Sequence, residues 1–161
     1  MTTVSTIVCA MVALTTKTTH TKLEMYTYIN GETNKACPTD WEMYNGRCYL
    51  FNSLQLNWAD AQESCMQKGA NLASLHSLEE STFVKELTSP DLIPSWIGGT
   101  DCQSTRWFWM DSTSMDFTDW CAAQPDTTLT ECCIQMNVGD RKCWDDTPCL
   151  HLHSSICAKP L

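Results

Sequence analysis

Cysteine is the residue type that most constrains how this chain can fold. The chain has 161 residues and 11 cysteines, and ten of these lie between Cys37 and Cys157, with Cys9 alone outside. An even set of cysteines within one compact segment is typical of a disulfide framework formed in an oxidising compartment. Zinc is the alternative, but no CxxC pair is present, and the adjacent Cys132 and Cys133 cannot easily both ligate one tetrahedral ion. We therefore expect disulfides.

The first 36 residues differ in composition from the rest of the chain. Val4 to Leu14 is apolar, but no Lys or Arg precedes it and no clear small-residue cleavage site follows, so it is interpreted as a degenerate signal peptide, with a misassigned N-terminus as the alternative. The run is too short to span a membrane. Thr15 to Lys35 is threonine-rich and polar. We expect residues 1–36 to be a signal, propeptide or linker of a secreted protein, and residues 37–161 to form one domain.

The charge of the chain excludes one class of ligand and favours another. The formal net charge is −9, and residues 1–36 carry three lysines against two glutamates, which is +1 and leaves −10 for the remainder. Nucleic-acid affinity rests on clustered Lys and Arg, so phosphate backbones would be repelled by this domain. Cations are its natural ligands.

Local patterns predict a hairpin at the start of the domain and a loop-rich second half. Cys37 and Cys48 flank the turn dipeptide Asn45-Gly46, which indicates a disulfide-pinned β-hairpin. From Trp96 onward the sequence has short aromatic runs with Gly, Asp and Cys and no helical periodicity, which predicts short strands and long bridged loops. The tryptophans throughout the domain are expected to pack in the core.

Two helices are predicted between the hairpin and Trp96. In residues 57–69, Trp58, Ala61, Cys65 and Met66 recur at helical spacing, with Asn57 as N-cap and Gly69 as the stop. In residues 77–87, the spacing of Ser77 and Glu80 is that of a capping box.

The stretch QPDTTLTECC, residues 124–133, is the candidate functional segment. It places Gln124, Asp126 and Glu131 in one loop among three threonines, and Asp145 and Asp146 follow in CWDD. Calcium takes about six to eight oxygen ligands, and carboxylates and amides supply them in proteins. The alternative is a solvated acidic loop. A catalytic carboxylate pair is disfavoured, because acid and base roles need two different environments, and no GxSxG or HExxH motif is present. We expect no enzyme activity.

Several motifs together resemble the C-type lectin-like domain over Cys37 to Lys159. They are Cys65 on the first helix, WIGG at 96–99, Gln124-Pro125-Asp126, CWDD at 143–146 and Cys157 near the end. Four further cysteines, Cys102, Cys121, Cys132 and Cys143, are similar to those of fish type II antifreeze proteins. Because Gln124, Asp126 and Glu131 are all present, the resemblance is to the calcium-dependent type. The resemblance implies an α+β domain with two helices, short antiparallel strands and long disulfide-bridged loops. It also implies the pairs Cys37–Cys48, Cys65–Cys157, Cys102–Cys132, Cys121–Cys143 and Cys133–Cys149.

The resemblance also implies a calcium site. Its ligands would be Gln124, Asp126, Glu131, Asp145 and Asp146, with a cis peptide bond between Gln124 and Pro125. Asp145 stands where the calcium-binding pattern has Asn, which raises the site from three carboxylates to four. Without an ion such a cluster repels itself, and one carboxyl is expected to hold a proton at a raised pKa.

Two ligands are considered for the surface above this site. By resemblance, Thr128, Leu129 and Thr130 would contact an ice crystal surface, because calcium can fix such short side chains as a rigid array. The alternative is a galactose-type glycan, since Gln-Pro-Asp is the triplet of galactose-binding relatives. Sugar sites usually need an aromatic face, and no aromatic residue lies between Asp126 and Glu131. The chain is expected to be a monomer that binds neither nucleic acid nor membrane.

Overall fold

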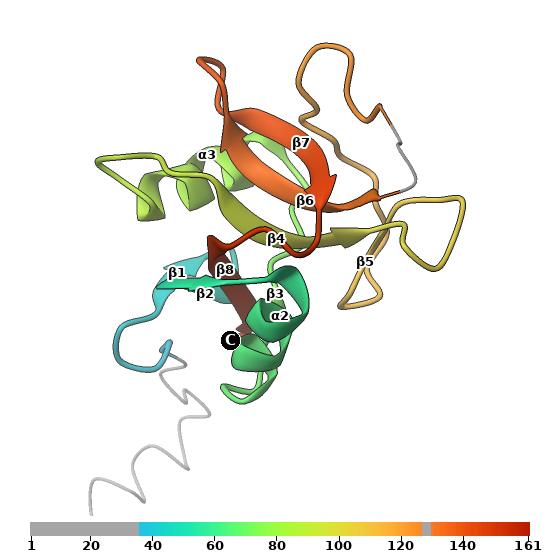
Figure 1. Cartoon of the computed structure of the whole chain (residues 1–161). Helices are drawn as coiled ribbons and strands as arrows, with labels where there is room; N and C mark the ends of the chain where they lie inside the picture. Colours follow the sequence, from blue (N-terminus) through green and yellow to red (C-terminus); the bar gives the residue numbers. More distant parts are fainter. Residues whose placement is uncertain (1–35, 127–129) are drawn as a thin grey trace, which may run out of the picture. The chain divides into compact units, whose positions relative to one another are not determined.

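The computed structural model in Figure 1 describes residues 36–126 and 130–161. The proposed role of residues 1–36 therefore falls almost entirely outside the described residues and stays a prediction. Helices α2 and α3 span Trp58–Met66 and Leu78–Leu87. The strands are β1 (Glu42–Tyr44), β2 (Arg47–Leu56), β3 (Asn71–Leu72), β4 (Ser95–Thr100), β5 (Phe108–Trp109), β6 (Glu131–Val138), β7 (Cys143–Pro148) and β8 (His153–Pro160). Within the described ranges, neither helix has the length and apolarity needed to cross a bilayer.

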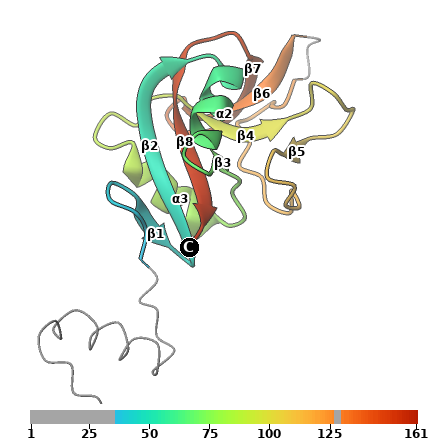
Figure 2. The same cartoon turned by 90° about the horizontal axis from the view of Figure 1, so that it is seen from below.

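The strands form one sheet in the order β1-β2-β8-β4-β6-β7, with β3 added beside β8 and β5 beside β4. Figure 2 shows the long strands β2 and β8 side by side with α2 against them. The strand pairs are antiparallel except β4 with β8, where Ser95 lies opposite Ser154 in a parallel register. The α+β class with two helices and antiparallel strands is confirmed, and the parallel contact at its centre is an addition to it.

The hairpin that opens the domain follows from its turn dipeptide. Asn45 and Gly46 both have positive φ, 45° and 76°, which is the conformation that a two-residue turn between right-twisted strands needs. Met43 then lies opposite Cys48 across β1 and β2. The disulfide from Cys37 to Cys48 pins this first strand pair.

Helix α2 begins and ends close to its predicted limits. Asn57 Oδ1 accepts a hydrogen bond of 2.9 Å from the Asp60 backbone N–H, as an N-cap does. Trp58, Ala61 and Cys65 are buried, but Met66 is 61 % exposed, so the prediction that Met66 belongs to the apolar face is wrong. The inward face is narrow and ends at Cys65.

Helix α3 has half of the predicted capping box. Ser77 Oγ accepts from the Glu80 N–H at 3.1 Å, which is the expected N-cap bond. The second bond of a capping box, from the Ser77 backbone N–H to the Glu80 carboxylate, is not formed. The Glu80 carboxylate accepts from the His76 N–H at 2.6 Å, from Arg47 Nη1 at 2.8 Å and from the Tyr49 hydroxyl, because it is buried among these donors. Glu80 therefore links the helix start to strand β2.

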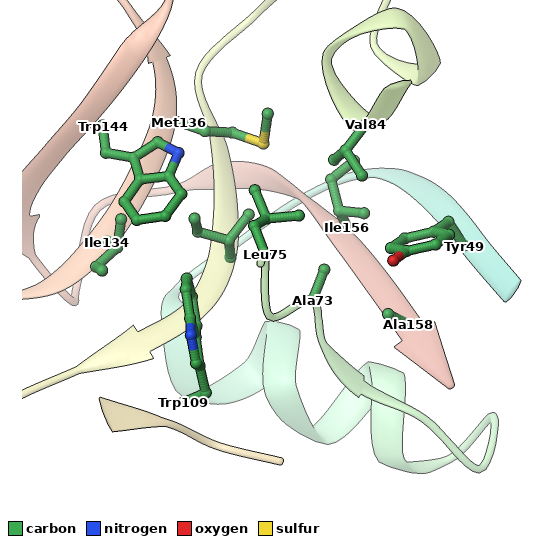
Figure 3. Packing of buried hydrophobic residues seen from close by; sticks show 11 residues of the cluster. Tyr49, Ala73, Leu75, Val84, Trp109, Ile134, Met136, Trp144, Ile156 and Ala158 are labelled. Carbon is green, nitrogen blue, oxygen red and sulfur yellow. The ribbon is translucent and has the colours of Figure 1, made fainter. Parts of the chain in front are cut away.

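Among the described residues, the larger of two buried hydrophobic clusters joins α3 to strands β2 and β4 to β8. Figure 3 shows Leu75 between two groups, with Trp109, Trp144 and Ile134 on one side and Tyr49, Ile156 and Val84 on the other. The rings of Trp109 and Trp144 meet edge to face at 5.6 Å between centroids. The second cluster packs α2 on the sheet through Trp58, Trp96, Leu72 and the bridge between Cys65 and Cys157. The expectation that the tryptophans are core residues holds for Trp58, Trp96, Trp109 and Trp144, which are buried.

Five disulfides join the described residues, and they are the five pairs that the resemblance implies: Cys37–Cys48, Cys65–Cys157, Cys102–Cys132, Cys121–Cys143 and Cys133–Cys149. Three of them hold the second half of the chain, where long loops connect β4 to β6. Cross-links of this kind restrict the unfolded chain and so offset the entropy that such loops lose on folding.

Candidate functional site

The candidate site lies where the loop before β6 meets β6 and β7 (Figure 1). Glu131 is the first residue of β6, and Asp145 and Asp146 lie on β7. In the antiparallel register Asp145 is opposite Gln135 and Asp146 is opposite Ile134. The pairing of β6 with β7 thus brings Glu131 near Asp145 and Asp146, which come more than a dozen positions later in the chain.

The loop that carries Gln124 and Asp126 is docked on β7. The Gln124–Pro125 peptide bond is cis, as the resemblance implies. The Asp126 N–H is shared between Gln124 Oε1 at 2.9 Å and Asp146 Oδ1 at 3.2 Å. One backbone donor therefore joins three of the five proposed ligand residues, and Asp146, which is 3 % exposed, lies beneath the loop.

Asp145 lies close enough to the other three carboxylates for their charges to act on it. Burial raises the pKa of Asp145, and the negative charges of Asp146, Glu131 and Asp126 raise it further. A hydrogen bond of 2.8 Å from Gln135 Nε2 to Asp145 Oδ2 acts in the opposite direction without reversing the shift. The raised pKa expected for a four-carboxylate cluster is thus found at Asp145, the residue that departs from the family pattern.

A fifth carboxylate lies beside the site and was missed by sequence reasoning. Asp101 follows β4, and its backbone N–H donates to Cys132 O at 3.2 Å. Burial raises the pKa of Asp101, and the charge of Asp146 raises it further. No local motif marks Asp101. Only the pairing of β4 with β6, which sets Thr100 opposite Cys133, brings it here.

The side chains supply the donor chemistry that calcium prefers, with one amide and four carboxylates and no nitrogen or sulfur. Their oxygens are not tightly gathered. Among residues 36–126 and 130–161, one group of three or more His, Cys, Asp or Glu places its ligand atoms within 4.8 Å of one another, and it consists of cysteines. Binding an ion by these carboxylates therefore requires a closer approach of their side chains.

Of the three residues proposed to contact ice, the structure describes Thr130. Thr130 is exposed and directly precedes Glu131. Thr128 and Leu129 lie outside the described residues, so their proposed contacts with ice stay predictions. Trp144 is fully buried, and the Trp120 ring packs against it at 5.8 Å, which agrees with the interpretation of both as packing residues.

Comparison with known proteins places these features in a family. Residues 54–159 match the family described as the lectin C-type domain. The type-2 ice-structuring protein of Osmerus mordax is 69 % identical over 157 residues, which cover 96 % of this chain and 90 % of the relative.

Solved structures agree with this assignment. The structure of herring type II antifreeze protein is 87 % identical with a TM-score of 0.76, and it covers 78 % of this chain and 99 % of its own. A calcium-dependent type II antifreeze protein in its calcium-free form is 78 % identical with a TM-score of 0.75, covering 76 % and 99 %. The chain therefore belongs to the C-type lectin family and, within it, to the type II ice-structuring proteins.

Proposed function

We propose that this protein binds calcium through the loop site and, with that loop fixed, adsorbs to ice and stops crystal growth. The observation that carries the proposal is the docking of the Gln124–Asp126 loop on Asp146 through the Asp126 N–H, with the charges of Asp146, Glu131 and Asp126 acting on Asp145. The exposed Thr130 directly precedes Glu131. It is supported by the identity of 87 % to a herring antifreeze protein and of 78 % to a calcium-dependent one. The five bridges fit a secreted protein, because disulfides persist in oxidising compartments.

In this proposal Gln124, Asp126, Glu131, Asp145 and Asp146 hold the ion. Calcium supplies the positive charge that the four carboxylates lack, and it relieves the repulsion that raises the pKa of Asp145. The Asp126 N–H already fixes the backbone of the loop against Gln124 and Asp146. The ion then fixes the side chains of Asp126 and Glu131, which lie on the two sides of residues 127–130.

Ice recognition needs an ordered array because a single hydroxyl adds little. A hydroxyl that bonds to ice gives up a similar bond to liquid water, so its net contribution is small. Several short side chains held at fixed spacing, each with a methyl and a hydroxyl, can act together. We assign this role to Thr128 and Thr130, and Leu129, which follows Thr128 in the sequence, would add methyl groups alone. Thr130 is exposed in the described part of the chain.

A galactose-type glycan is the second candidate ligand, favoured by the Gln-Pro-Asp triplet at residues 124–126. In the part of the chain that the structure describes, neither Trp120 nor Trp144 offers a free aromatic face for the apolar side of the sugar. Trp144 is buried, and Trp120 packs edge to face between Trp107 and Trp144. Ice is therefore the better supported ligand.

The test is ice-crystal morphology and freezing-point hysteresis of the refolded full chain, first with calcium and then with EDTA. We expect faceted crystals with calcium and round discs after chelation, restored when calcium is added back. Full ice shaping in excess EDTA would show that the ion is not needed. Round discs in both conditions, from protein shown to bind calcium by calorimetry, would favour the glycan, and retention on a galactose column would then decide.

A variant at Thr130 separates the ice surface from the ion site. Thr130→Gln enlarges an exposed side chain, so we expect at least half of the hysteresis to be lost while the calcium dissociation constant changes less than about threefold, a small free-energy difference. Thr39→Gln is the matched control, because Thr39 is exposed and precedes β1, at the opposite edge of the sheet from β7. Loss of calcium affinity together with hysteresis would assign Thr130 to the ion site instead.

A further inference from the structure

Two disulfides lie against each other at the start of β6. The sulfurs of Cys102, Cys132, Cys133 and Cys149 all lie within 4.8 Å of one another, and we call them the four-sulfur cluster. Across the two bridges, the Sγ atoms of Cys132 and Cys149 are 3.5 Å apart, those of Cys102 and Cys149 3.4 Å, and those of Cys102 and Cys133 3.9 Å. These distances are close to contact between non-bonded sulfurs.

The backbone explains how adjacent cysteines reach one cluster. Successive side chains of a strand point to opposite faces, which would separate Cys132 from Cys133. The pairing of β6 with β7 shifts register between Glu131 and Cys133, as it does at a β-bulge, and this irregularity re-aims the side chains. Cys132 and Cys133, although adjacent, thus bring their sulfurs into one cluster, each within its own disulfide.

The cluster is open to small molecules. Cys102 is exposed, whereas Cys133 is fully buried. A pocket of about 320 Å³ is lined by Cys102, Cys133 and Cys149 together with Trp58, Phe108 and Met110. Disulfide exchange requires access of a thiolate to a sulfur, and Cys102 offers the accessible one.

We propose that the four-sulfur cluster is a thiol-reactive site at which a small thiol exchanges the partners of the two bridges. A thiolate attacks Cys102 Sγ, forms a mixed disulfide there and releases the Cys132 thiolate. The Cys132 thiolate attacks Cys149 Sγ at 3.5 Å, forms a Cys132–Cys149 bridge and releases the Cys133 thiolate. The Cys133 thiolate attacks Cys102 Sγ at 3.9 Å, forms a Cys102–Cys133 bridge and releases the small thiol. Two bridges are present before and after, so no net oxidant or reductant is consumed.

Chain geometry selects this product over the other rearrangement. Attack on Cys132 instead would free Cys102, and its route through Cys149 would end in a bridge between the adjacent Cys132 and Cys133. Consecutive Cα atoms are about 3.8 Å apart across a trans peptide, whereas disulfides usually span about 4.4–6.8 Å between Cα atoms. The adjacent bridge is therefore disfavoured, and the exchanged form has Cys102 joined to Cys133.

Charge selects the class of thiol. The domain carries a formal −10, and Asp101 directly precedes Cys102. An anionic thiol is repelled by these charges, so the site favours a small neutral thiol. The exchange requires neither ice binding nor calcium binding. Because Cys132 directly follows Glu131, the exchange would nevertheless change which cysteine anchors the segment that carries Glu131.

The test uses an internal thiol in place of the small molecule. In the full chain with Cys9→Ser, the change Cys102→Ser leaves Cys132 without its partner. The folded protein is incubated, acid-quenched, denatured and labelled with N-ethylmaleimide at mildly acidic pH, and tandem mass spectrometry locates the label. We expect label on Cys133 as well as Cys132, appearing about tenfold faster per pH unit up to about pH 8.5, because the thiolate is the attacking species.

The matched control is Cys121→Ser, which frees Cys143, a residue outside the four-sulfur cluster. Its label is expected to stay on Cys143. Label confined to Cys132 in the Cys102→Ser chain at every pH would overturn the proposal.

If the Cys102→Ser chain does not fold, the Cys9→Ser chain treated with 2-mercaptoethanol decides. Label must then enter Cys132 and Cys133 before Cys65 or Cys157. Entry at Cys65 or Cys157 first would reject the site.

Discussion

At the scale of single residues, Arg47 organises the polar side chains that join β2 to the loops. Its Nη1 donates to Glu80 Oε1 at 2.8 Å and to Ser74 O at 3.0 Å, and its Nη2 lies 3.6 Å from Asp111 Oδ2. Asp111 also accepts from Ser74 Oγ and from the N–H and hydroxyl of Thr113. Half-buried charges of this kind stabilise the fold only while their partners are present.

The protonation of Asp111 should make stability depend on pH. Burial alone would raise the pKa of Asp111, but hydrogen bonds from Ser74 and Thr113 and the charge of Arg47 outweigh burial and hold the pKa below its ordinary value. A carboxyl whose pKa is lower in the folded state stabilises the fold above the unfolded value of about 3.9. That stabilisation is lost as pH falls through the folded value.

We therefore expect Asp111→Asn to lower the free energy of unfolding by about 1–3 kcal/mol at neutral pH, since the amide offers one acceptor fewer and no charge. The difference from wild type should shrink below about pH 4. Urea unfolding at a series of pH values measures it, with Asp91→Asn at an exposed position as the control. A difference that does not change with pH would mean that geometry rather than charge stabilises this contact.

The same scale shows what single residues could reveal in advance. Gln124, Asp126 and the Asp145-Asp146 pair stand in short motifs, so the sequence marks them as candidate calcium ligands, which stays a prediction. The position of Asp101 beside the site depends on the pairing of β4 with β6, and the side-chain direction of Cys132 depends on the register shift between β6 and β7. No short sequence motif encodes either pairing. The hydrogen bonds of Glu80 with Arg47 and Tyr49 also depend on tertiary contact. They occupy a carboxylate that the capping-box pattern assigns to the start of α3.

At the scale of elements, β4 owes its position to two glycines. A Cβ at Gly98 would lie 2.5 Å from Leu72 O, a backbone atom of β3. A Cβ at Gly99 would overlap Cδ1 of Ile134, the end of a flexible side chain on β6. The two neighbours differ in how far they can move, so the two positions should respond differently to the same change.

We expect Gly98→Ala to destabilise the protein by about 3 kcal/mol or more and Gly99→Ala by about 1–2 kcal/mol, because overpacking costs most where backbone must shift. Both have ordinary negative or extended φ, so Cβ contact and not backbone strain decides the cost. Thermal unfolding of the two variants side by side provides the measurement. Equal losses would show that β3 can move away from β4.

Elements with local signals were predictable, and those joined over long distances were not. Asn45-Gly46, Asn57 and Ser77 each satisfy backbone groups within a few residues, so the hairpin and both helix starts were predictable. The parallel contact of β4 with β8 joins segments with most of the second half of the chain between them. Parallel neighbours need a long crossover, and nothing near either strand marks the pairing.

At the scale of the whole molecule, the disulfides close loops of very different length. The Cys65–Cys157 bridge spans 92 residues and is fully buried, whereas Cys37–Cys48 spans 11 at the edge of the sheet. Family resemblance, rather than spacing, implied this pairing, because ten cysteines can pair in many ways. In the fold, the Cys65–Cys157 bridge joins α2 to β8, the strand that lies between β2 and β4 in the sheet.

The length of the loop that each bridge closes predicts how much that bridge contributes to the free energy of unfolding. In the chain-entropy description, a bridge that closes 92 residues contributes about 4.6 kcal/mol and one that closes 11 about 2.8 kcal/mol. We expect the double change Cys65→Ala with Cys157→Ala to lower the free energy of unfolding by about 2 kcal/mol more than Cys37→Ala with Cys48→Ala. Guanidinium unfolding of both, with the slope checked for a change in the unfolded state, measures the difference. Equal losses would mean that packing around each bridge, and not restriction of the unfolded chain, sets its contribution.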